Sequence, residues 1–356
     1  MYRYIGNKTK LLPYIIEKTQ MLIGDSGTVS DIMAGTGTVS LEFRRNGYSV
    51  IASDMMTYSF HHLVVNLLLN TSPSFVGVPI AVSGQSTPYE AVLSYLNSLA
   101  SVKGFFYKEF SPEGKPTSGD DPRKYFTPAN AAKIDAIREQ INSWIDAKQI
   151  TDCEASLLKH TLIMAVNNVA NISGTYGHYL SKFDKNATEP LILTAVAFDP
   201  SPNIAHTILQ GFAEDLAEQI TADLCYIDPP YMKRQYAANY HILETLARGD
   251  FPDALGKSGL RNWWDQHSKL CTKTQGLQSL ERIMGKMHCN TFLVSYSEDG
   301  LFSLEQLKDC FMKFGQVDVQ EIDYNRFRSN GSPLPKKLKE YLITVKKQEV
   351  IHGTRG

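Results

Sequence analysis

The sequence predicts an α/β fold: a mixed sheet with helices on both faces, interrupted by a largely helical and loop-containing insertion. Two β-type runs, 28–33 and 48–53, alternate with helical patterns at 39–45 and 60–69. Such alternation is typical of strands that lie parallel in one sheet while helices pack on both of its faces. The pattern breaks off over residues 71–205 and returns afterwards, which indicates an insertion.

The composition is that of an ordinary globular protein, with 43% hydrophobic residues and a net charge of −1 over 356 residues. So small a charge gives no support to a non-specific nucleic-acid coat, which would usually be basic. No apolar run approaches the length of a membrane span, and the N-terminus lacks a secretory signal pattern. The five cysteines show no CxxC spacing. We therefore expect reduced thiols, no metal site, and a location in the cytoplasm.

Local patterns assign the elements of each part. The insertion contains a loop over 103–126, rich in glycine and proline, which is followed by helices over 128–148 and 152–171. Thr127 is a suitable N-cap for the first of these helices, because its hydroxyl can accept from the first turn. In the resumed α/β pattern we expect strands at 224–227, 291–295, 317–324 and 340–345, and helices at 212–220, 240–247 and 304–314.

A glycine-containing turn follows the first predicted strand, in the run Asp31-Ile32-Met33-Ala34-Gly35-Thr36-Gly37-Thr38-Val39. Glycines let the backbone approach a ligand closely, and the N-terminus of the next helix favours an anionic group. Asp54 ends the next strand, where an acid meets ribose hydroxyls in dinucleotide-binding folds. Ser40 replaces the third glycine of such a fold. This favours a ligand with a carboxylate and a ribose but no phosphate, such as S-adenosylmethionine; a nicotinamide cofactor and an ordinary glycine turn stay open.

A second motif, Asp228-Pro229-Pro230-Tyr231, follows a short apolar strand. The adenine amine is a poor nucleophile because its lone pair is delocalised, so an enzyme has to hold and aim the nitrogen. Asp228 offers a carboxylate, the carbonyl of Pro229 offers a second acceptor, and the two prolines stiffen the turn. Tyr231 offers a ring on which an extruded base can stack. A turn in which Asp228 only caps the backbone is the alternative, and the position at a strand's carboxyl end argues against it.

With both motifs in this order, the sequence resembles the Dam-like, alpha-class N6-adenine DNA methyltransferases. Tyr4-Ile5-Gly6-Asn7-Lys8 matches the aromatic-x-Gly-x-Lys pattern with which that family opens. Arg234-Gln235-Tyr236 and Asn239-Tyr240-His241-x-Leu243-Glu244 resemble a run found in methylases of type II restriction–modification systems. Val294-Ser295-Tyr296 resembles a later strand motif. The resemblance covers nearly the whole chain and is loosest in the insertion.

The resemblance implies a Rossmann-like methyltransferase domain formed by residues 1–70 and 206–356, with residues 71–205 as a target-recognition insertion. It implies direct methyl transfer from S-adenosylmethionine to the N6 amine of a flipped adenine in double-stranded DNA. S-adenosylhomocysteine is then the product, and no metal is needed. Asp228 would bind the target amine, and Tyr231 would stack on the base. The residues implied for the methyl donor are Tyr4, Lys8, Asp31, Met33, Ala34, Gly35, Gly37, Thr38, Asp54, Met55, Asp215 and Asp228.

Basic and aromatic residues outside the two motifs are candidates for DNA contacts, because cations can neutralise phosphates. Trp263 and Trp264 are either wedges that enter DNA or core residues. The resemblance also favours membership of a restriction–modification system, in which a cognate nuclease would form no stable complex with this chain. A methylase that acts without a nuclease stays open. The other predicted DNA-contacting residues are Lys233, Arg234, Tyr176, Tyr179, Arg326 and Arg328.

Several other functions compete with adenine methylation. Asp228 favours adenine over the N4 amine of cytosine, since that class more often carries serine there, and over protein amides, whose methylases usually carry asparagine. A nicotinamide oxidoreductase would explain the glycine turn and not the second motif. A DNA-binding protein without catalysis is a further alternative, and the intact motif argues against it. The DNA recognition sequence does not follow from one chain.

Overall fold

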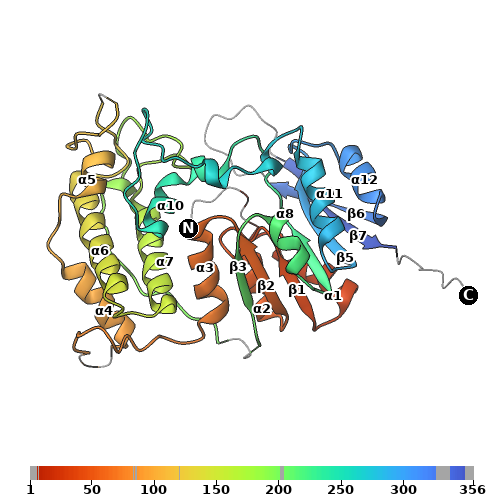
Figure 1. Cartoon of the computed structure of the whole chain (residues 1–356), viewed down its shortest axis with the longest axis horizontal. Helices are drawn as coiled ribbons and strands as arrows, with labels where there is room; N and C mark the ends of the chain where they lie inside the picture. The colour runs from red at the N-terminus through yellow and green to blue at the C-terminus, as the bar shows by residue number, and fades with distance from the viewer. Residues whose placement is uncertain are drawn as a thin grey trace, which may run out of the picture. The chain divides into compact units, whose positions relative to one another are not determined.

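The computed structural model describes residues 6, 8–82, 84, 86–119, 121–200, 204–325 and 337–348. The chain forms two compact units, each of which collects segments that are distant in sequence (Figure 1). The first, which we call the helical unit, comprises Met1–Asn7, Met56–Ser201 and Tyr236–His267. The second, the sheet unit, comprises Lys8–Met55, Pro202–Gln235 and Ser268–Gly356.

The sheet unit contains a seven-stranded mixed sheet. Its strands are β1 (Thr28–Asp31), β2 (Ser49–Asp54), β3 (Thr207–Gln210), β4 (Leu224–Ile227), β5 (Thr291–Ser297), β6 (Gly315–Asn325) and β7 (Lys337–Lys347). They lie in the order β3-β2-β1-β4-β5-β7-β6. Neighbours among β1 to β5 are parallel, whereas β7 is antiparallel to both β5 and β6. The predicted mixed sheet is confirmed, and it contains one strand, β3, that the sequence patterns did not identify.

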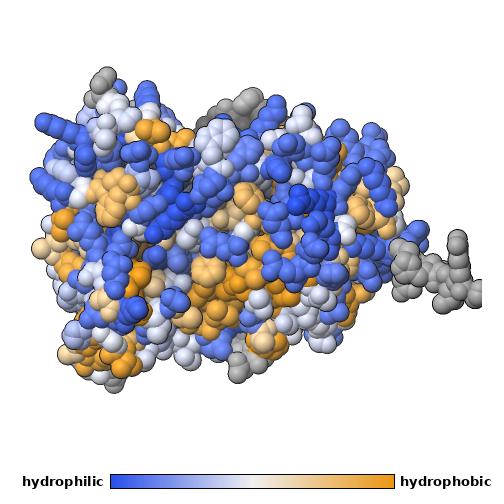
Figure 2. Space-filling model, viewed as in Figure 1, coloured by the Kyte–Doolittle hydropathy of each residue, from blue (hydrophilic) through white to orange (hydrophobic). Residues whose placement is uncertain are grey.

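Helices cover both faces of this sheet, as predicted for the fold class. On one face lie α1 (Leu12–Ile23) and α2 (Thr38–Arg45), and Phe43 of α2 meets the ring of Tyr226 of β4 at 6.0 Å. On the other face lie α8 (Ala213–Leu216), α11 (Gly276–Lys286) and α12 (Leu304–Met312), which share a buried core with Ile227 and Phe292. The exposed side of α11 and α12 is mostly hydrophilic (Figure 2). Successive strand residues point to opposite faces, so the apolar strands fill both cores.

The motif residues follow the carboxyl ends of neighbouring parallel strands. Asp31 ends β1, Asp54 ends β2, and Asp228 comes directly after β4. Parallel strands end at the same edge of a sheet, and a ligand site of an open α/β sheet lies at that edge. The predicted helix at 212–220 is the short α8 followed by a 3-10 turn, Ala217–Gln219. It begins beside this edge because β3, which ends just before it, is parallel to β2.

The helical unit is built from seven α-helices in the part of the chain that the structure describes. They are α3 (Thr57–Leu68), α4 (Pro88–Ser98), α5 (Phe105–Phe110), α6 (Pro128–Asp146), α7 (Asp152–Val169), α9 (Tyr236–Asn239) and α10 (His241–Arg248). The predictions of helices over 128–148 and 152–171 are confirmed by α6 and α7. The N-cap prediction is confirmed as well, since the Thr127 side chain accepts from the Asn130 N–H at 3.2 Å. No helix among the described residues is both long and apolar enough to cross a membrane.

The prediction of a plain loop over 103–126 is wrong, because α5 lies within it. Asp135 of α6 accepts hydrogen bonds from the backbone N–H groups of Phe106 and Tyr107 at 2.7 and 2.8 Å. A carboxylate at these orphan N–H groups stabilises the start of a helix. The carboxylate comes from a different helix, so the local sequence pattern of 103–126 does not reveal it.

A buried acid holds α3 and α10 together within the helical unit. Glu244 of α10 is fully buried and accepts from the N–H groups of Thr57 and Tyr58, at 2.9 and 3.2 Å, at the first turn of α3. Arg248 one turn further along α10 donates to the same carboxylate at 2.8 Å. These contacts join α3 to α10, and both helices belong to the same unit as residues 71–201 although neither lies within that segment.

Candidate active site at the carboxyl ends of the parallel strands

The glycine turn between β1 and α2 has the backbone that its motif requires. Gly35 and Gly37 have φ angles of 54° and 74°, in the left-handed region that favours glycine. Asp54 accepts a hydrogen bond from the Gly35 N–H at 2.9 Å. The hydroxyls of Thr36 and Thr38 lie 3.0 Å apart at the start of α2. The acid that ends β2 is thereby held against the turn that follows β1.

Asp31 is a buried carboxylate beneath this turn, with 1% of its surface exposed. Ser40 donates to its Oδ2 at 2.6 Å, whereas Oδ1 has no hydrogen-bond partner among the described residues. Burial raises the pKa of Asp31 to about 7; the Ser40 hydrogen bond lowers it, and the nearby charges of Asp228 and Asp54 raise it further. Ser40, which departs from the dinucleotide-binding pattern, thus serves to hold Asp31.

The Asp228–Tyr231 turn belongs to a largely buried cluster of ionisable side chains. The ammonium of Lys8, a residue with 5% of its surface exposed, lies 3.2 Å from Asp228 Oδ1 and 2.8 Å from Glu340 Oε1. The Tyr231 hydroxyl lies 2.8 Å from the same Asp228 oxygen and 2.6 Å from the same Glu340 oxygen. Lys8 also donates to that hydroxyl, and its Nζ lies 4.4 Å from the centroid of the Tyr231 ring. The two carboxylates therefore share the same two donors.

Two members of this cluster were not predicted from the sequence. Glu340 of β7 is 3% exposed, and Ser295 of β5 donates to its Oε1 at 3.0 Å. The one signal in the sequence is an acid directly before an apolar run in the last strand. Ser295 lies in the strand motif Val294-Ser295-Tyr296, but the family resemblance implied no role for this serine.

Burial and neighbouring charges shift the pKa values of the ionisable groups in this cluster. Burial raises the pKa of Asp228 to about 6, while Lys8 lowers it and Glu340 raises it. Burial alone would lower the pKa of Lys8, but Asp228 and Glu340 outweigh burial and hold this pKa above its usual value. Burial, followed by the charges of Asp228 and Glu340, raises the pKa of Tyr231 well above its usual value. At neutral pH Lys8 is therefore charged, and Asp228 is mostly ionised.

The other residues predicted for the methyl donor lie in varied surroundings. Met33 packs against the core that α8 and α11 share, and Met55 is partly exposed after the end of β2. The Ala34 N–H donates to the carbonyl of Ser53 at 3.0 Å, which ties the glycine turn to β2. Asp215 of α8 is exposed and pairs with Arg282 of α11 at 3.2 Å. Tyr4 lies outside the described residues.

The predicted DNA contacts fall into three groups. Lys233 and Arg234 are exposed after the Asp228–Tyr231 turn, and Tyr179 is partly exposed, 5.1 Å from the ring of Tyr125. The side chain of Tyr176 is fully buried and its hydroxyl donates to Asn167 at 3.2 Å, which argues against the predicted DNA contact of this side chain. Arg326 and Arg328 lie outside the described residues.

The tryptophan pair is not part of a core. Trp264 is 71% exposed, and its ring lies nearly parallel to those of Trp263 and His267, at 4.9 and 5.5 Å. A hydrophobic ring exposed to this extent loses the stabilisation that burial would provide, of about 1.5–3 kcal/mol for a large apolar side chain. The surface of the helical unit thus carries a stack of aromatic rings in which the Trp264 side chain is exposed to solvent.

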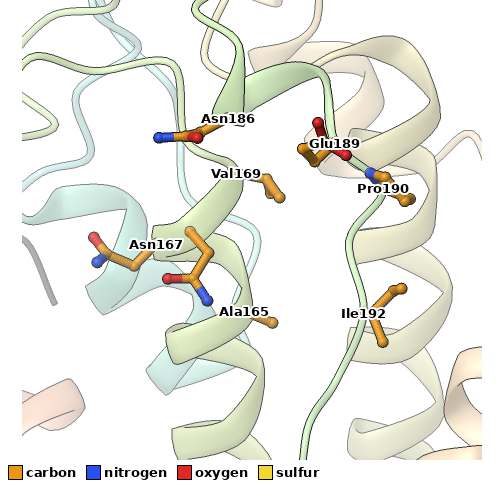
Figure 3. Close-up of a pocket in the computed structure, with 8 residues that line it drawn as sticks. Ala165, Asn167, Val169, Asn186, Glu189, Pro190 and Ile192 are labelled. Atoms are coloured by element: carbon orange, nitrogen blue, oxygen red, sulfur yellow. The ribbon is translucent and has the colours of Figure 1, made fainter. Parts of the chain in front are cut away.

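A pocket of about 410 Å³ lies in the helical unit, between the end of α7 and the segment 186–192 (Figure 3). Ala165 and Val169 of α7 point towards the segment that carries Pro190 and Ile192, and the side chain of Asn167 points away from it (Figure 3). None of the residues predicted for the methyl donor lines this pocket. The motif residues gather instead at the edge of the sheet in the other unit.

The sheet order, the glycine turn and the Asp-Pro-Pro-Tyr turn together define an α/β methyltransferase that acts on an amine. Residues 4–315 match the family model of D12 class N6 adenine-specific DNA methyltransferases, and the chain belongs to this family. Methylation of the N6 amine of adenine in DNA is therefore confirmed over methylation of cytosine, oxidoreduction and loss of catalysis. Membership also implies S-adenosylmethionine as the methyl donor.

Several curated proteins are similar to this chain over most of its length. It is 32% identical over 332 residues to the type II methyltransferase M.NlaIII of Neisseria lactamica, with 92% of each chain covered. It is 28% identical over 355 residues to M.CviAII of Paramecium bursaria Chlorella virus 1, covering 96% of this chain and 97% of that protein. It is 32% identical over 350 residues to M.FokI of Planomicrobium okeanokoites, covering 97% of this chain and 52% of that protein. The chain thus spans about half the length of M.FokI.

We expect Asp31→Asn to flatten the pH dependence of stability. The folded pKa of about 7 lies above the ordinary value of 3.8. The contribution of Asp31 to stability is thus fully present below the ordinary pKa and is lost as the pH rises through about 7. The free energy of unfolding falls by roughly 4 kcal/mol over this range. Urea unfolding between about pH 4 and pH 8 should show a smaller fall for the variant. The exposed Asp309 provides the control, Asp309→Asn. Parallel curves for wild type and Asp31→Asn would contradict the assignment.

Proposed function

We propose that the sheet unit binds S-adenosylmethionine over the turn from Gly35 to Gly37. The half-buried carboxylate of Asp54, held by the Gly35 N–H, is placed to bind ribose hydroxyls. Asp31 has one carboxylate oxygen without a partner in the described part of the chain, and this oxygen suits the ammonium group of the donor. These polar groups fit a ligand with a ribose and an amino-acid moiety. When bound, S-adenosylmethionine supplies an electrophilic methyl group.

We further propose that Asp228 holds and aims the target amine, with the Pro229 carbonyl as the second acceptor. The observation that carries this proposal is the position of Asp228 at the same sheet edge as Asp31, close enough for the charge of Asp228 to raise the pKa of Asp31. The Asp228 side chain is 19% exposed, so one part of it stays accessible. An ionised carboxylate that accepts from an N6–H group localises the lone pair of that nitrogen and fixes its direction.

Asp228→Ala should abolish methyl transfer, because the amine loses its charged acceptor. The assay follows labelled methyl groups from S-adenosylmethionine into DNA, and single-molecule sequencing of DNA from an expressing host identifies the modified base and its context. Asp309→Ala, at an exposed position on α12, is the matched control and should keep full activity. Retained methylation in Asp228→Ala would remove this residue from the mechanism.

Asp54→Ala should weaken binding of S-adenosylmethionine about 10- to 100-fold, the effect of losing a hydrogen bond to a charged group. Isothermal titration calorimetry measures this affinity without any DNA. Asp318 is an exposed acid of the sheet unit that pairs with Lys18, so Asp318→Ala is a suitable control. Equal affinities for wild type and Asp54→Ala would exclude the ribose contact.

We propose that the helical unit contributes DNA recognition, with residues 71–205 as its main reading segment. The exposed stack of Trp263, Trp264 and His267 supports contact with DNA bases, since aromatic rings stack on bases of any sequence. In the sheet unit, the exposed cations Lys233 and Arg234 are suited to phosphates, and phosphate contacts position a protein without reading sequence.

Trp264→Ala should weaken binding to duplex DNA about 5- to 100-fold, as expected for the loss of one base–aromatic stack. Fluorescence anisotropy with a labelled duplex that contains the mapped site measures this change. Met21 on α1 is equally exposed, at 70% against 71%, so Met21→Ala controls for the loss of an exposed apolar side chain. An unchanged affinity for Trp264→Ala would show that the stack lies away from the DNA.

We infer that the protein modifies DNA in a restriction–modification system and acts in the cytoplasm of a bacterial or phage-infected cell. The similar proteins carry the names of type II methyltransferases and modification methylases, which supports this role. A host that expresses the chain should become resistant to a nuclease that cuts at the mapped sequence. If the nuclease still cuts DNA whose sites are fully methylated, the methylation does not protect against that nuclease, and the proposed pairing of the two enzymes is wrong.

A further inference from the structure

Glu340 is a buried carboxylate in the active site for which the proposed reaction provides no role. Its Oε1 lies 2.8 Å from the Lys8 ammonium, 2.6 Å from the Tyr231 hydroxyl and 3.0 Å from the Ser295 hydroxyl, all of which can donate to it. The residue lies on the antiparallel strand β7, whereas Asp228 follows the parallel strand β4. A carboxylate with 3% of its surface exposed is costly unless it is paired, so its position requires an explanation.

The donors around Asp228 compete with the target amine. Lys8 and the Tyr231 hydroxyl both contact Asp228 Oδ1, at 3.2 and 2.8 Å. The hydroxyl has one proton, so it donates to Asp228 or to Glu340 at any one time. When it donates to Asp228 Oδ1, it and Lys8 together occupy both lone pairs of that oxygen. Both donors lie closer to Glu340 than to Asp228: 2.8 Å against 3.2 Å for Lys8, and 2.6 Å against 2.8 Å for the hydroxyl. Glu340 is therefore an alternative acceptor that lies within reach of both.

We propose that Glu340 is a positioning residue, which takes the Lys8 ammonium and the Tyr231 hydroxyl from Asp228 when the target amine arrives. Asp228 Oδ1 then accepts from the amine, while Lys8 stays paired in a buried ion pair with Glu340. No covalent bond forms or breaks in this exchange, since two hydrogen-bond donors move between two acceptors. The inference rests on the proposed role of Asp228.

The charge balance of the cluster favours such an exchange. With Lys8 bound to Glu340, the buried pair is neutral, and the charge of Asp228 is available for the amine. Without Glu340, the ammonium has only Asp228 as a carboxylate partner within the cluster. Breaking the buried Lys8–Asp228 pair would then leave the ammonium without a partner, which is costly. The target amine would therefore have to compete with a charged donor for Asp228.

The same groups set the pH at which Asp228 becomes an acceptor. Tyr231 and Lys8 contact Asp228 directly, and Glu340, Asp31 and Tyr226 interact with it electrostatically. Burial raises the pKa of Asp228 to about 6, Lys8 lowers it, and Glu340 raises it. Removal of the Glu340 charge should therefore lower this pKa, and removal of the Lys8 charge should raise it further.

Glu340→Gln in the full chain tests the proposal through kcat/KM for DNA methylation as a function of pH. We expect kcat/KM above pH 7 to fall by roughly 100-fold, the effect of a misplaced reacting group. We also expect the acid limb of the profile, which reports the pKa of the free enzyme, to move to lower pH. A role in folding alone would lower activity and leave this limb in place. Glu321→Gln on the neighbouring strand β6, where Glu321 pairs with Lys339, is the control and should behave as wild type.

The double variant Lys8→Met with Glu340→Gln removes the competing ammonium together with its acceptor. At a saturating concentration of S-adenosylmethionine, which compensates for the predicted donor contact of Lys8, it should regain part of the kcat/KM that Glu340→Gln loses, because no cation is left to occupy Asp228. If Glu340→Gln does not fold, Lys8→Met alone tests the proposal, since its acid limb should move to higher pH than in wild type.

The proposal is overturned if Glu340→Gln keeps wild-type kcat/KM, if its acid limb does not move to lower pH, or if the double variant is as slow as Glu340→Gln. A Lys8→Met limb that stays in place or moves to lower pH also overturns it. These outcomes differ from a failure of the proposed function, which would appear as methylation by Asp228→Ala. With Asp228→Ala inactive and Glu340→Gln normal, only the role of Glu340 is lost.

Discussion

The ammonium group of Lys8 lies between two carboxylates, 2.8 Å from Glu340 and 3.2 Å from Asp228, and the arrangement of the site depends on this sharing. Burying two acids close together is unfavourable unless a cation balances them. Lys8 provides that cation from the start of the chain, Asp228 comes from the turn after β4, and Glu340 comes from β7. One ammonium thereby connects three distant segments of the sheet unit and also contacts the Tyr231 ring and hydroxyl.

Negative charge accumulates at the same sheet edge, because parallel strands end together. Asp31, Asp54 and Asp228 each follow or end such a strand, and their mutual repulsion contributes to a pKa of about 7 for Asp31. This arrangement costs stability, but it provides acceptors for a ligand rich in hydroxyl and amino groups and for a target amine. The carboxylates that lower the stability of the folded protein by repelling one another are thus the same groups that are placed to bind the ligands. Only a fold with adjacent parallel strands places three such residues together at one edge.

The two units differ in the way in which they are held together. The sheet unit joins its segments through strand pairing, whereas the helical unit uses buried acids that accept from the first turns of helices. Glu244 holds the start of α3, and Asp135 holds the start of α5. Carboxylates at helix N-termini satisfy N–H groups that otherwise have no partner. The exposed aromatic stack around Trp264 belongs to the helical unit, so the proposed contact with bases and the proposed chemistry are assigned to different parts of the chain.

The sequence by itself determined the fold class and the two motifs, and the resemblance to a known family indicated, through Asp228, the adenine amine as the target. These depend on local patterns: alternating strands and helices, glycines with positive φ, and four consecutive residues at the end of a strand. Only the tertiary structure identified Glu340, which lies opposite Ser297 in the register of β7 with β5 and so reaches the Asp228 turn. It likewise revealed α5, whose start is held by a carboxylate of α6, and the burial of Tyr176. In each of these cases the deciding contact joins residues far apart in the chain, and a contact of that kind has no local sequence pattern.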